Sequence, residues 1–220
     1  MSESRSISRP QFEFPKIHSF PPFYTKQPNQ TIQQQQLESW ANIILQYCEF
    51  YKITSLTSEG LPKHSQTSKT SLPSLFQNKS INRHVNADFR STILAHLIHT
   101  KQAEYINHKK PELGMFIYWR SIVDWGNILY DYISNTGQKG TVFTLYELTR
   151  QGRGENNNDD DDDDAAAAYL DTDNESLLPE ELQNMDELLL IKVIQEHLMK
   201  QGKAQILMNE HNQIGGVKIV

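Results

Sequence analysis

The stretch LESWANIILQY at residues 37–47 decides the fold, because a similar stretch, IVDWGNILYDY, recurs at residues 122–132. In both, apolar residues recur at the i, i+3, i+4, i+7 spacing of one buried helix face. A later match, at a larger offset, pairs Leu97-Ile98 with Leu198-Met199 and Ala103 with Ala204. Two matches in the same order predict a duplicated domain.

Each copy is expected to contain a long helix, a short helical region, a second long helix and a two-stranded hairpin. This order is the winged-helix arrangement, a relative of helix-turn-helix. In chain order, the expected elements are a helix from Thr31 to about Tyr51, a helix over 86–101, a hairpin of 103–106 and 115–119, a helix over 122–134, a strand at 142–143, a helix capped by Thr144 and Glu147, a helix over about 185–201 begun by Asn184 and Glu187, and a hairpin of 204–207 and 217–220.

The fold class predicted from this pattern is α+β and mainly helical, with two winged-helix domains in tandem. We expect an extended arm over 1–29, a first domain over 30–120 and a second over 121–220. The second domain is interrupted at about 151–175 by a tract with six consecutive Asp and four Ala. Like charges repel and bury no apolar surface, so this insertion is expected to be disordered.

The N-terminal arm centres on Phe20-Pro21-Pro22-Phe23-Tyr24. Proline fixes φ near the polyproline II value and pushes a preceding residue toward extended geometry, so the segment should be stiff and extended. Phe14 and Pro15 add a second aromatic-proline pair upstream. A stiff, aromatic segment outside any periodic pattern is expected to fill a groove on a partner, because part of its ordering entropy is already lost.

The net charge of −6 conceals an uneven distribution. Residues 155–187 contain 14 of the 27 acidic residues and no Lys or Arg, so the remaining 13 face all 21 basic residues and that part carries +8. A mildly basic surface is compatible with nucleic acid or anionic lipid, although a solvated surface of mixed charge is the simpler interpretation.

The chain shows no sign of membrane insertion or secretion. No run approaches the ~20 apolar residues of a membrane helix, and the first residues lack the apolar core of a signal peptide. The single cysteine, Cys48, excludes an internal disulfide. We therefore expect a protein of a reducing compartment, the cytoplasm.

No catalytic, metal or cofactor site is predicted. His84, His96 and His99 lack the partners of known zinc motifs and are interpreted as polar surface residues. Cys48 falls on the buried face of the first helix, without a neighbouring base that would make it a nucleophile. No glycine-rich phosphate loop precedes a helix.

The small number of basic residues on the two helices that precede the hairpins also argues against nucleic-acid binding. The helix before the first hairpin offers only Arg83, Arg90 and Lys101, and the corresponding second helix only Lys192 and Lys200, beside several acids. Phosphate binding needs several cations converging on one face. The two domains are therefore expected to bind proteins.

The proline-aromatic arm and the sequence Val142-Phe143-Thr144-Leu145-Tyr146-Glu147-Leu148 together resemble the family of the smallest ESCRT-II subunit, vacuolar protein sorting-associated protein 25. The resemblance runs from about residue 12 to the end, apart from the Ser/Thr-rich loop of the first domain and the acidic insertion. It includes Phe12-Glu13-Phe14-Pro15, Gln27-Pro28-Asn29 and the Trp40 helix.

The resemblance implies a non-enzymatic adaptor of two tandem winged helices. Two copies would each dock through the arm onto one of the two larger ESCRT-II subunits. The second winged helix would recruit the ESCRT-III subunit that starts filament assembly, so that ubiquitinated cargo enters multivesicular bodies, with the complex peripheral on the endosomal membrane. The docking residues implied are Phe14, Pro15, Phe20, Pro21, Pro22, Phe23 and Tyr24.

Two alternatives remain open at the level of sequence. Pro21-Pro22-Phe23-Tyr24 fits Pro-Pro-x-Tyr, the pattern that WW domains bind as polyproline II. The tandem winged helices could instead bind DNA or serve in transcription, in which case duplex affinity would fall steeply with salt.

Overall fold

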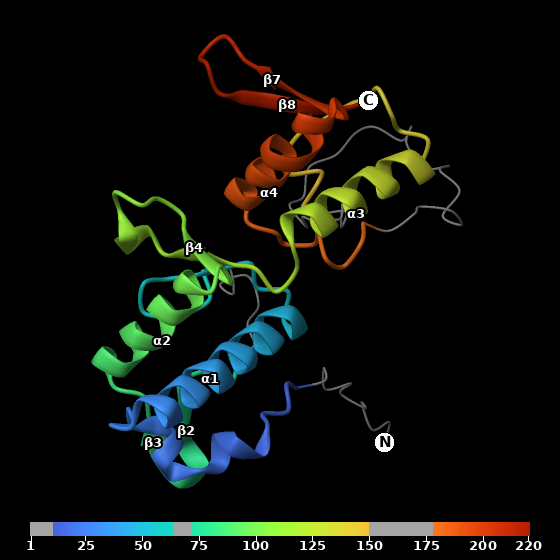
Figure 1. The fold of residues 1–220 in the computed structure, drawn as a ribbon. Coiled ribbons are helices and arrows are strands. Elements are labelled where there is room, and N and C mark those ends of the chain that lie inside the picture. The colour runs from blue at the N-terminus through green and yellow to red at the C-terminus, as the bar shows by residue number, and fades with distance from the viewer. Residues whose placement is uncertain (1–10, 64–71, 150–177) are drawn as a thin grey trace, which may run out of the picture. The chain divides into compact units, whose positions relative to one another are not determined.

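The computed structural model describes residues 11–63, 72–149 and 178–220. The chain divides into two compact units, Met1–Arg120 and Ser121–Val220. Figure 1 shows both as small mixed α+β folds with helices packed beside short antiparallel sheets. The expected acidic insertion at 151–175 lies outside the described residues. In the described residues, no helix is both long and apolar enough to cross a membrane.

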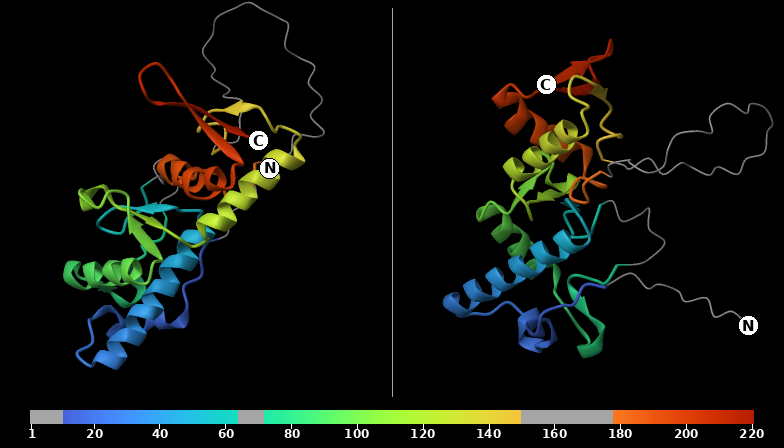
Figure 2. Two further views of the ribbon diagram at one scale, coloured as in Figure 1. Left: turned by 45° about the horizontal axis from the view of Figure 1, so that its top comes forward. Right: turned by 90° about the vertical axis from the view of Figure 1, so that its right-hand side faces the viewer.

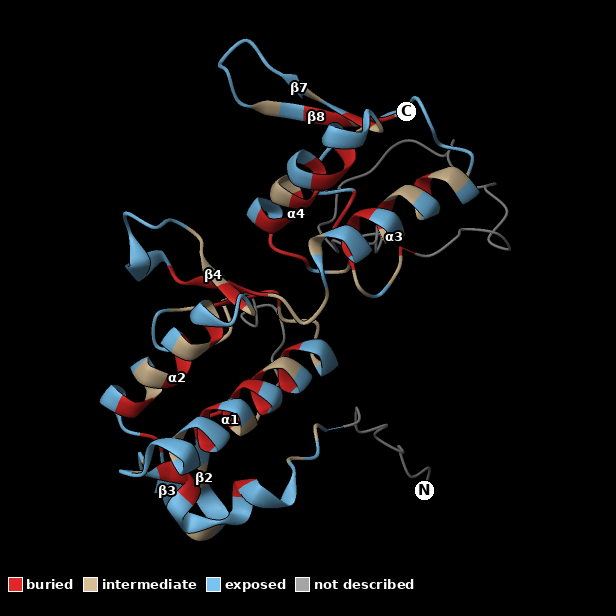
Figure 3. Ribbon diagram, in the orientation of Figure 1, coloured by how far each residue is buried: buried red, intermediate tan, exposed pale blue. Residues whose placement is uncertain are grey.

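Unit 1 is organised around helix α1, Gln30–Phe50, and helix α2, Ala87–His99. The two helices pack against each other, and their buried faces lie toward each other in Figure 3. The apolar spacing predicted both helices, which the structure confirms. The core of this unit is formed by side chains from both helices, the sheet and the N-terminal segment, among them Phe23, Trp40, Ile44, Leu56, Phe89, Ile93, Leu97 and Met115.

The sheet of unit 1 has three antiparallel strands, β1 (Ser55–Leu56), β4 (Ala103–Tyr105) and β5 (Met115–Ile117), in the order β1-β5-β4. Strands β4 and β5 form the expected hairpin, with Glu104 opposite Phe116. A separate two-stranded sheet, β2 (Gln77–Asn78) and β3 (Arg83–His84), comes after α1 and before α2 in the sequence. Within the described residues, the short helical region expected between the two long helices is limited to one 3₁₀ turn, η4 (Lys79–Ile81), which lies between β2 and β3 and ends at left-handed Asn82.

Apart from β2 and β3, the described part of unit 2 repeats the order of elements of unit 1, as Figures 1 and 2 show. Its elements are α3 (Ile122–Asn135), β6 (Val142–Phe143), α4 (Glu187–Val193), β7 (Ala204–Met208) and β8 (Ile214–Ile219). The strand order β6-β8-β7 places the last strand in the centre, as β1-β5-β4 does in unit 1. The two tryptophans of the repeated stretches, Trp40 and Trp125, are both fully buried.

Three local predictions need correction. Helix α1 begins at the Asn29 cap, whose side chain accepts a bond from the Ile32 N–H, instead of at Thr31. The second long helix is capped by Asp186, because Asn184 adopts a left-handed conformation, φ +58°, that a helix cap does not use. Beyond α4 this helix continues as a π-helical turn, Ile194–Leu198, and a 3₁₀ turn, Met199–Gln201, ending at left-handed Gly202 as expected.

The predicted capping box after β6 is present as hydrogen bonds but not as a helix. The Thr144 N–H donates to Glu147 Oε2 at 2.7 Å, and the Glu147 N–H donates to Thr144 Oγ1 at 3.2 Å. Residues 145–149 nevertheless form a turn, which places Leu148 in the core of unit 2.

Candidate partner-binding site

The predicted extended, polyproline II conformation of the N-terminal segment is wrong for residues 16–19 and 21–24. The segment forms two consecutive 3₁₀ turns, η1 (Lys16–Ser19) and η2 (Pro21–Tyr24), joined by extended Phe20. The turns are closed by bonds from the Phe20 N–H to the Ile17 carbonyl and from the Phe23 N–H to the Phe20 carbonyl, each at 3.0 Å. The φ that proline imposes suits a helical turn as well as polyproline II, so proline spacing alone does not separate them.

The second turn packs against its own domain. Phe23 and Tyr24 are each only 3% exposed. The Phe23 ring stacks on the Trp40 indole with centroids 4.4 Å apart, and Tyr24 meets the same indole edge-on at 5.6 Å. Figure 1 shows this segment, in dark blue, beside the first turns of α1 and near β2 and β3. The groove that the two aromatic rings fill therefore belongs to unit 1 itself.

Polar contacts from α1 fix the backbone of this turn. The Trp40 indole N–H donates to the Phe23 carbonyl at 3.2 Å. Buried Gln36 donates to the carbonyls of Phe23 and Thr25, each at 2.9 Å, and accepts from the Gln27 N–H at 3.3 Å. Sequence reasoning missed Gln36, although its position one helical turn before Trp40 places it on the buried face.

The first turn is held by His18, which is 4% exposed. Its ring stacks on Phe14 with centroids 3.9 Å apart. Asn78 donates to the His18 carbonyl at 2.9 Å, and its amide nitrogen lies 3.3 Å from His18 Nδ1. The Tyr24 hydroxyl donates to the same carbonyl at 2.8 Å, which ties the two turns together.

Burial shifts the pKa of two side chains in this cluster. It lowers the pKa of His18, partly opposed by the Leu75 carbonyl, and raises the pKa of Tyr24 to about 12. His18 is therefore neutral at pH 7, since both its ordinary pKa and the shift favour that form.

An aromatic cluster holds the start of the described segment against the far end of α1. The Phe12 N–H donates to the Tyr51 hydroxyl at 2.9 Å. The Phe12 ring lies 5.0 Å from that of Phe14 and 5.6 Å from that of Tyr47 between centroids. The segment thus runs along α1 and is fixed at both ends.

A compact set of apolar residues remains exposed on the two turns. Phe20 is 55% exposed and Ile17 is 38% exposed, and Pro21 and Pro22 are exposed beside them. We call Ile17, Phe20, Pro21 and Pro22 the docking patch. Phe20 forms no ring contact with another aromatic residue of the described chain, whereas Phe14 stacks on His18.

The seven predicted docking residues fall into three groups by burial. Phe23 and Tyr24 are buried, Phe14 is half-buried, and Pro15, Phe20, Pro21 and Pro22 are exposed. Ile17 was not among them. The sequence carries no signal for it, because the repeated pattern FPKIHS at 14–19 and FPPFYT at 20–25 pairs Ile17 with Phe23, which is buried.

The WW-ligand alternative is not compatible with this conformation. A WW domain takes its ligand as polyproline II and contacts the tyrosine of Pro-Pro-x-Tyr. Here Pro21–Tyr24 is a 3₁₀ turn and Tyr24 is buried with its hydroxyl bonded to His18.

Cys48 and the three histidines considered for chemistry all belong to unit 1. Cys48 is fully buried, and burial raises the pKa of its thiol. His84 and His99 are exposed and His96 is half-buried on α2. Among the described residues, no three His, Cys, Asp or Glu side chains are grouped so that they could hold a metal ion.

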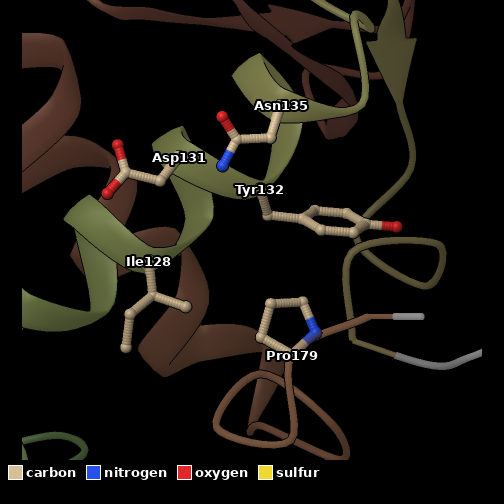
Figure 4. Close-up of a pocket in the computed structure, with 5 residues that line it drawn as sticks. All are labelled: Ile128, Asp131, Tyr132, Asn135 and Pro179. Atoms are coloured by element: carbon tan, nitrogen blue, oxygen red, sulfur yellow. The ribbon is translucent and has the colours of Figure 1, made fainter. Parts of the chain in front are cut away.

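Unit 2 has a shallow hollow of about 360 Å³ beside α3. Ile128, Asp131, Tyr132 and Asn135 come from α3, and Pro179 lies opposite Ile128 and Tyr132 (Figure 4). Its lining is mixed and open. Lys192, the single basic residue of α4, is paired with Glu196 at 3.0 Å.

Comparison with known proteins points to a single family. Residues 17–160 match the model of the family described as ESCRT-II complex subunit. Human vacuolar protein-sorting-associated protein 25 is 31% identical over 196 residues, covering 89% of this chain and 92% of that protein.

Solved structures give the same result for the fold. The crystal structure of subunit VPS25 of the endosomal trafficking complex ESCRT-II superposes with a TM-score of 0.72 and 25% identity, covering 93% of this chain and 98% of that one. A chain in the crystal structure of the ESCRT-II complex (VPS22/VPS25/VPS36) is similar in fold, with a TM-score of 0.67 and 24% identity over 94% of this chain and 98% of its own length.

Proposed function

This chain belongs to the ESCRT-II complex subunit family, in which it is a non-enzymatic subunit of endosomal sorting, and we propose that it is the adaptor that links the larger ESCRT-II subunits to ESCRT-III. Its partners are the two larger subunits, as VPS22 and VPS36 accompany VPS25 in the solved complex. Two copies serve each complex, each docked through its own N-terminal segment. The observation that carries this proposal is the exposed docking patch, held rigid by buried neighbours.

The docking patch suits a hydrophobic interface. Phe20 presents a large apolar side chain with 55% of its surface exposed, flanked by the exposed rings of Pro21 and Pro22. Burial of such an aromatic side chain contributes about 1.5–3 kcal/mol. Central aromatic anchors of this kind dominate binding energy in interfaces.

Rigidity of the segment lowers the entropic cost of docking. The Phe23 and Thr25 carbonyls are already bonded to Gln36, and the Phe23 carbonyl also to Trp40, so the turn that carries Pro21 and Pro22 has little freedom left to lose. The docking patch is accordingly assigned to contact with the partner, together with Phe14 and Pro15, which precede it in the chain. Phe23 and Tyr24 are assigned to support, because their rings are inside unit 1.

Unit 2 is proposed to bind ESCRT-III. Apart from the β2–β3 sheet of unit 1, each unit has the element order helix, strand, helix, hairpin, with the last strand central, and this order supports the tandem winged-helix assignment. With unit 1 engaged by a larger subunit, unit 2 is left to recruit the nucleating ESCRT-III subunit. The complex would act peripherally on the endosomal membrane in sorting ubiquitinated cargo.

Co-purification tests the docking step. The chain with Phe20, Pro21 and Pro22 all replaced by alanine should no longer co-purify with the larger subunits, while its circular dichroism stays unchanged. Ile32→Ala is the matched control, because Ile32 is 51% exposed on α1 outside the docking patch. Retention of the complex by the triple variant would refute the proposal.

A further inference from the structure

Two lysines converge on one tyrosine in unit 2. Lys139 Nζ lies 2.6 Å from the Tyr130 hydroxyl and 4.2 Å from the centroid of its ring, and Lys203 Nζ lies 4.5 Å from the same centroid. Tyr130 belongs to α3, Lys139 to the loop between α3 and β6, and Lys203 immediately precedes β7. Three separate segments therefore bring two ammonium groups against one phenol ring.

No carboxylate neutralises these lysines within residues 11–63, 72–149 and 178–220, where neither forms an ion pair. The two positive charges are held no more than about 9 Å apart by their common ring contact. Like charges at that separation repel each other, so an anion between them would relieve the repulsion as well as bind. The short bond from Lys139 is also the main cause that lowers the pKa of the Tyr130 phenol.

We propose that Tyr130, Lys139 and Lys203 form a receptor site for the phosphate monoester group of a phosphorylated side chain on a partner protein. A phosphate monoester carries close to two negative charges at pH 7 and several acceptor oxygens. Two ammonium groups match that charge, whereas a carboxylate would leave one cation uncompensated. Lysine ammonium groups and a hydroxyl are suitable donors to such oxygens.

The charge of the surrounding unit favours a single phosphate over a polyanion. The described residues of unit 2 include five lysines and no arginine against nine Asp and Glu, a balance of −4. A nucleic-acid duplex or an anionic membrane would meet this net negative unit over a wide area and be repelled. A single phosphate on a protein side chain would meet only the local pair of lysines. The site is separate from the docking patch of unit 1, so it can be tested independently of the docking step.

The test is a titration of the isotope-labelled full chain, followed by backbone amide shifts in NMR. The probe is a short Gly/Ala peptide with one phosphoserine, compared with the same peptide carrying unmodified serine. We expect saturable shifts around residues 130, 139 and 203 with the phosphopeptide alone. Equal shifts with the unmodified peptide, or no saturable shift with either, would overturn the proposal.

Variants locate the site. Lys139→Ala or Lys203→Ala should each weaken phosphopeptide binding by about tenfold, the effect of losing one charge-assisted hydrogen bond. Lys200→Ala is the control, because Lys200 is exposed three residues away on the preceding 3₁₀ turn. An equal loss in the control would contradict the assignment, as would unchanged binding in the Lys139→Ala and Lys203→Ala variants.

Two further probes distinguish a phosphorylated protein from a free phosphate ion and from an anionic lipid. Inorganic phosphate should bind more weakly than the phosphopeptide, and phosphatidylserine vesicles should not sediment the chain through these lysines. Equal affinity for inorganic phosphate, or sedimentation that Lys139→Ala and Lys203→Ala abolish, would replace the partner-protein ligand with a free ion or a lipid.

Discussion

The indole of Trp40 holds Phe23 in two ways at once. Its face stacks on the Phe23 ring at 4.4 Å with the planes inclined by 10°, and its N–H donates to the Phe23 carbonyl at 3.2 Å. Side chain and backbone of the same residue are thereby fixed to α1. This anchor places Phe20, three residues earlier, outside the domain.

The anchor predicts a division between stability and binding. Phe23→Ala removes a buried aromatic ring and should lower the free energy of unfolding by about 3–5 kcal/mol. Phe20→Ala removes an exposed ring and should change it by about 0.5 kcal/mol or less. Chemical denaturation of both variants checks this, and equal losses would show that Phe20 is part of the core.

Gln36 should be required for the shape of the second turn. Gln36→Leu keeps the side chain's bulk but leaves the Phe23 and Thr25 carbonyls without its donor, at a cost of about 1–3 kcal/mol in the free energy of unfolding. Gln35→Ala, at an exposed position of the same helix, is the control. If both variants denature at the same urea concentration as the unchanged chain, the polar contacts of Gln36 contribute nothing.

His18 should make unit 1 less stable in mild acid. Burial lowers its pKa, so below the ordinary value of about 6.5 the unfolded chain binds a proton that the folded chain resists. The stabilisation is complete above that pH and is lost as the pH falls toward the lowered value. His18→Phe keeps an aromatic ring against Phe14 but cannot titrate.

The measurement is the free energy of unfolding of both chains from about pH 7.5 to 5, a range that spans the ordinary histidine pKa. As the pH falls, the free energy of unfolding should decrease more for the unchanged chain than for His18→Phe. The other histidines are common to both chains, so their contributions cancel in this difference. Parallel pH curves would show that His18 does not titrate differently in the folded state.

Gly126 in α3 should tolerate no side chain. A Cβ at this position would lie 2.4 Å from His197 Cδ2, and His197 is buried with its Nε2 3.0 Å from Asn127 Oδ1. Gly126→Ala should therefore destabilise unit 2 by about 1–3 kcal/mol through overpacking. Gly215→Ala is the control, since its Cβ would meet only ordinary contacts at 3.5 Å. A thermal melt in which both variants unfold together would contradict the packing argument.

Periodicity predicted the parts of this fold that depend on burial. The spacing of Trp40 and Trp125 with their neighbours located α1 and α3, and the apolar strands after α2 and α4 located both hairpins. The π-helical turn at Ile194–Leu198 was not predictable, because apolar spacing does not distinguish it from continuing α-helix. The caps at Asn29 and Asp186 were each displaced by two residues, because several nearby polar residues could serve.

The sequence singled out the segment that carries the candidate site, but it did not predict the conformation of that segment. Proline has the same φ in a 3₁₀ turn and in polyproline II, so Pro21 and Pro22 could not decide between them. What decides is tertiary: Trp40 and Gln36 on α1 bind the Phe23 carbonyl and draw the chain into a turn. The exposure of Phe20 follows from that turn, and the sequence around Phe20 does not indicate it.

The central claim is that Phe20 contacts the partner while its buried neighbours only support it. Isothermal titration of the chain into the two purified larger ESCRT-II subunits tests this directly. Phe20→Ala should weaken binding by about 2 kcal/mol or more, roughly thirtyfold in Kd, with its melting temperature unchanged. Ile32→Ala should bind as the unchanged chain does. An unchanged Kd for Phe20→Ala would contradict the account.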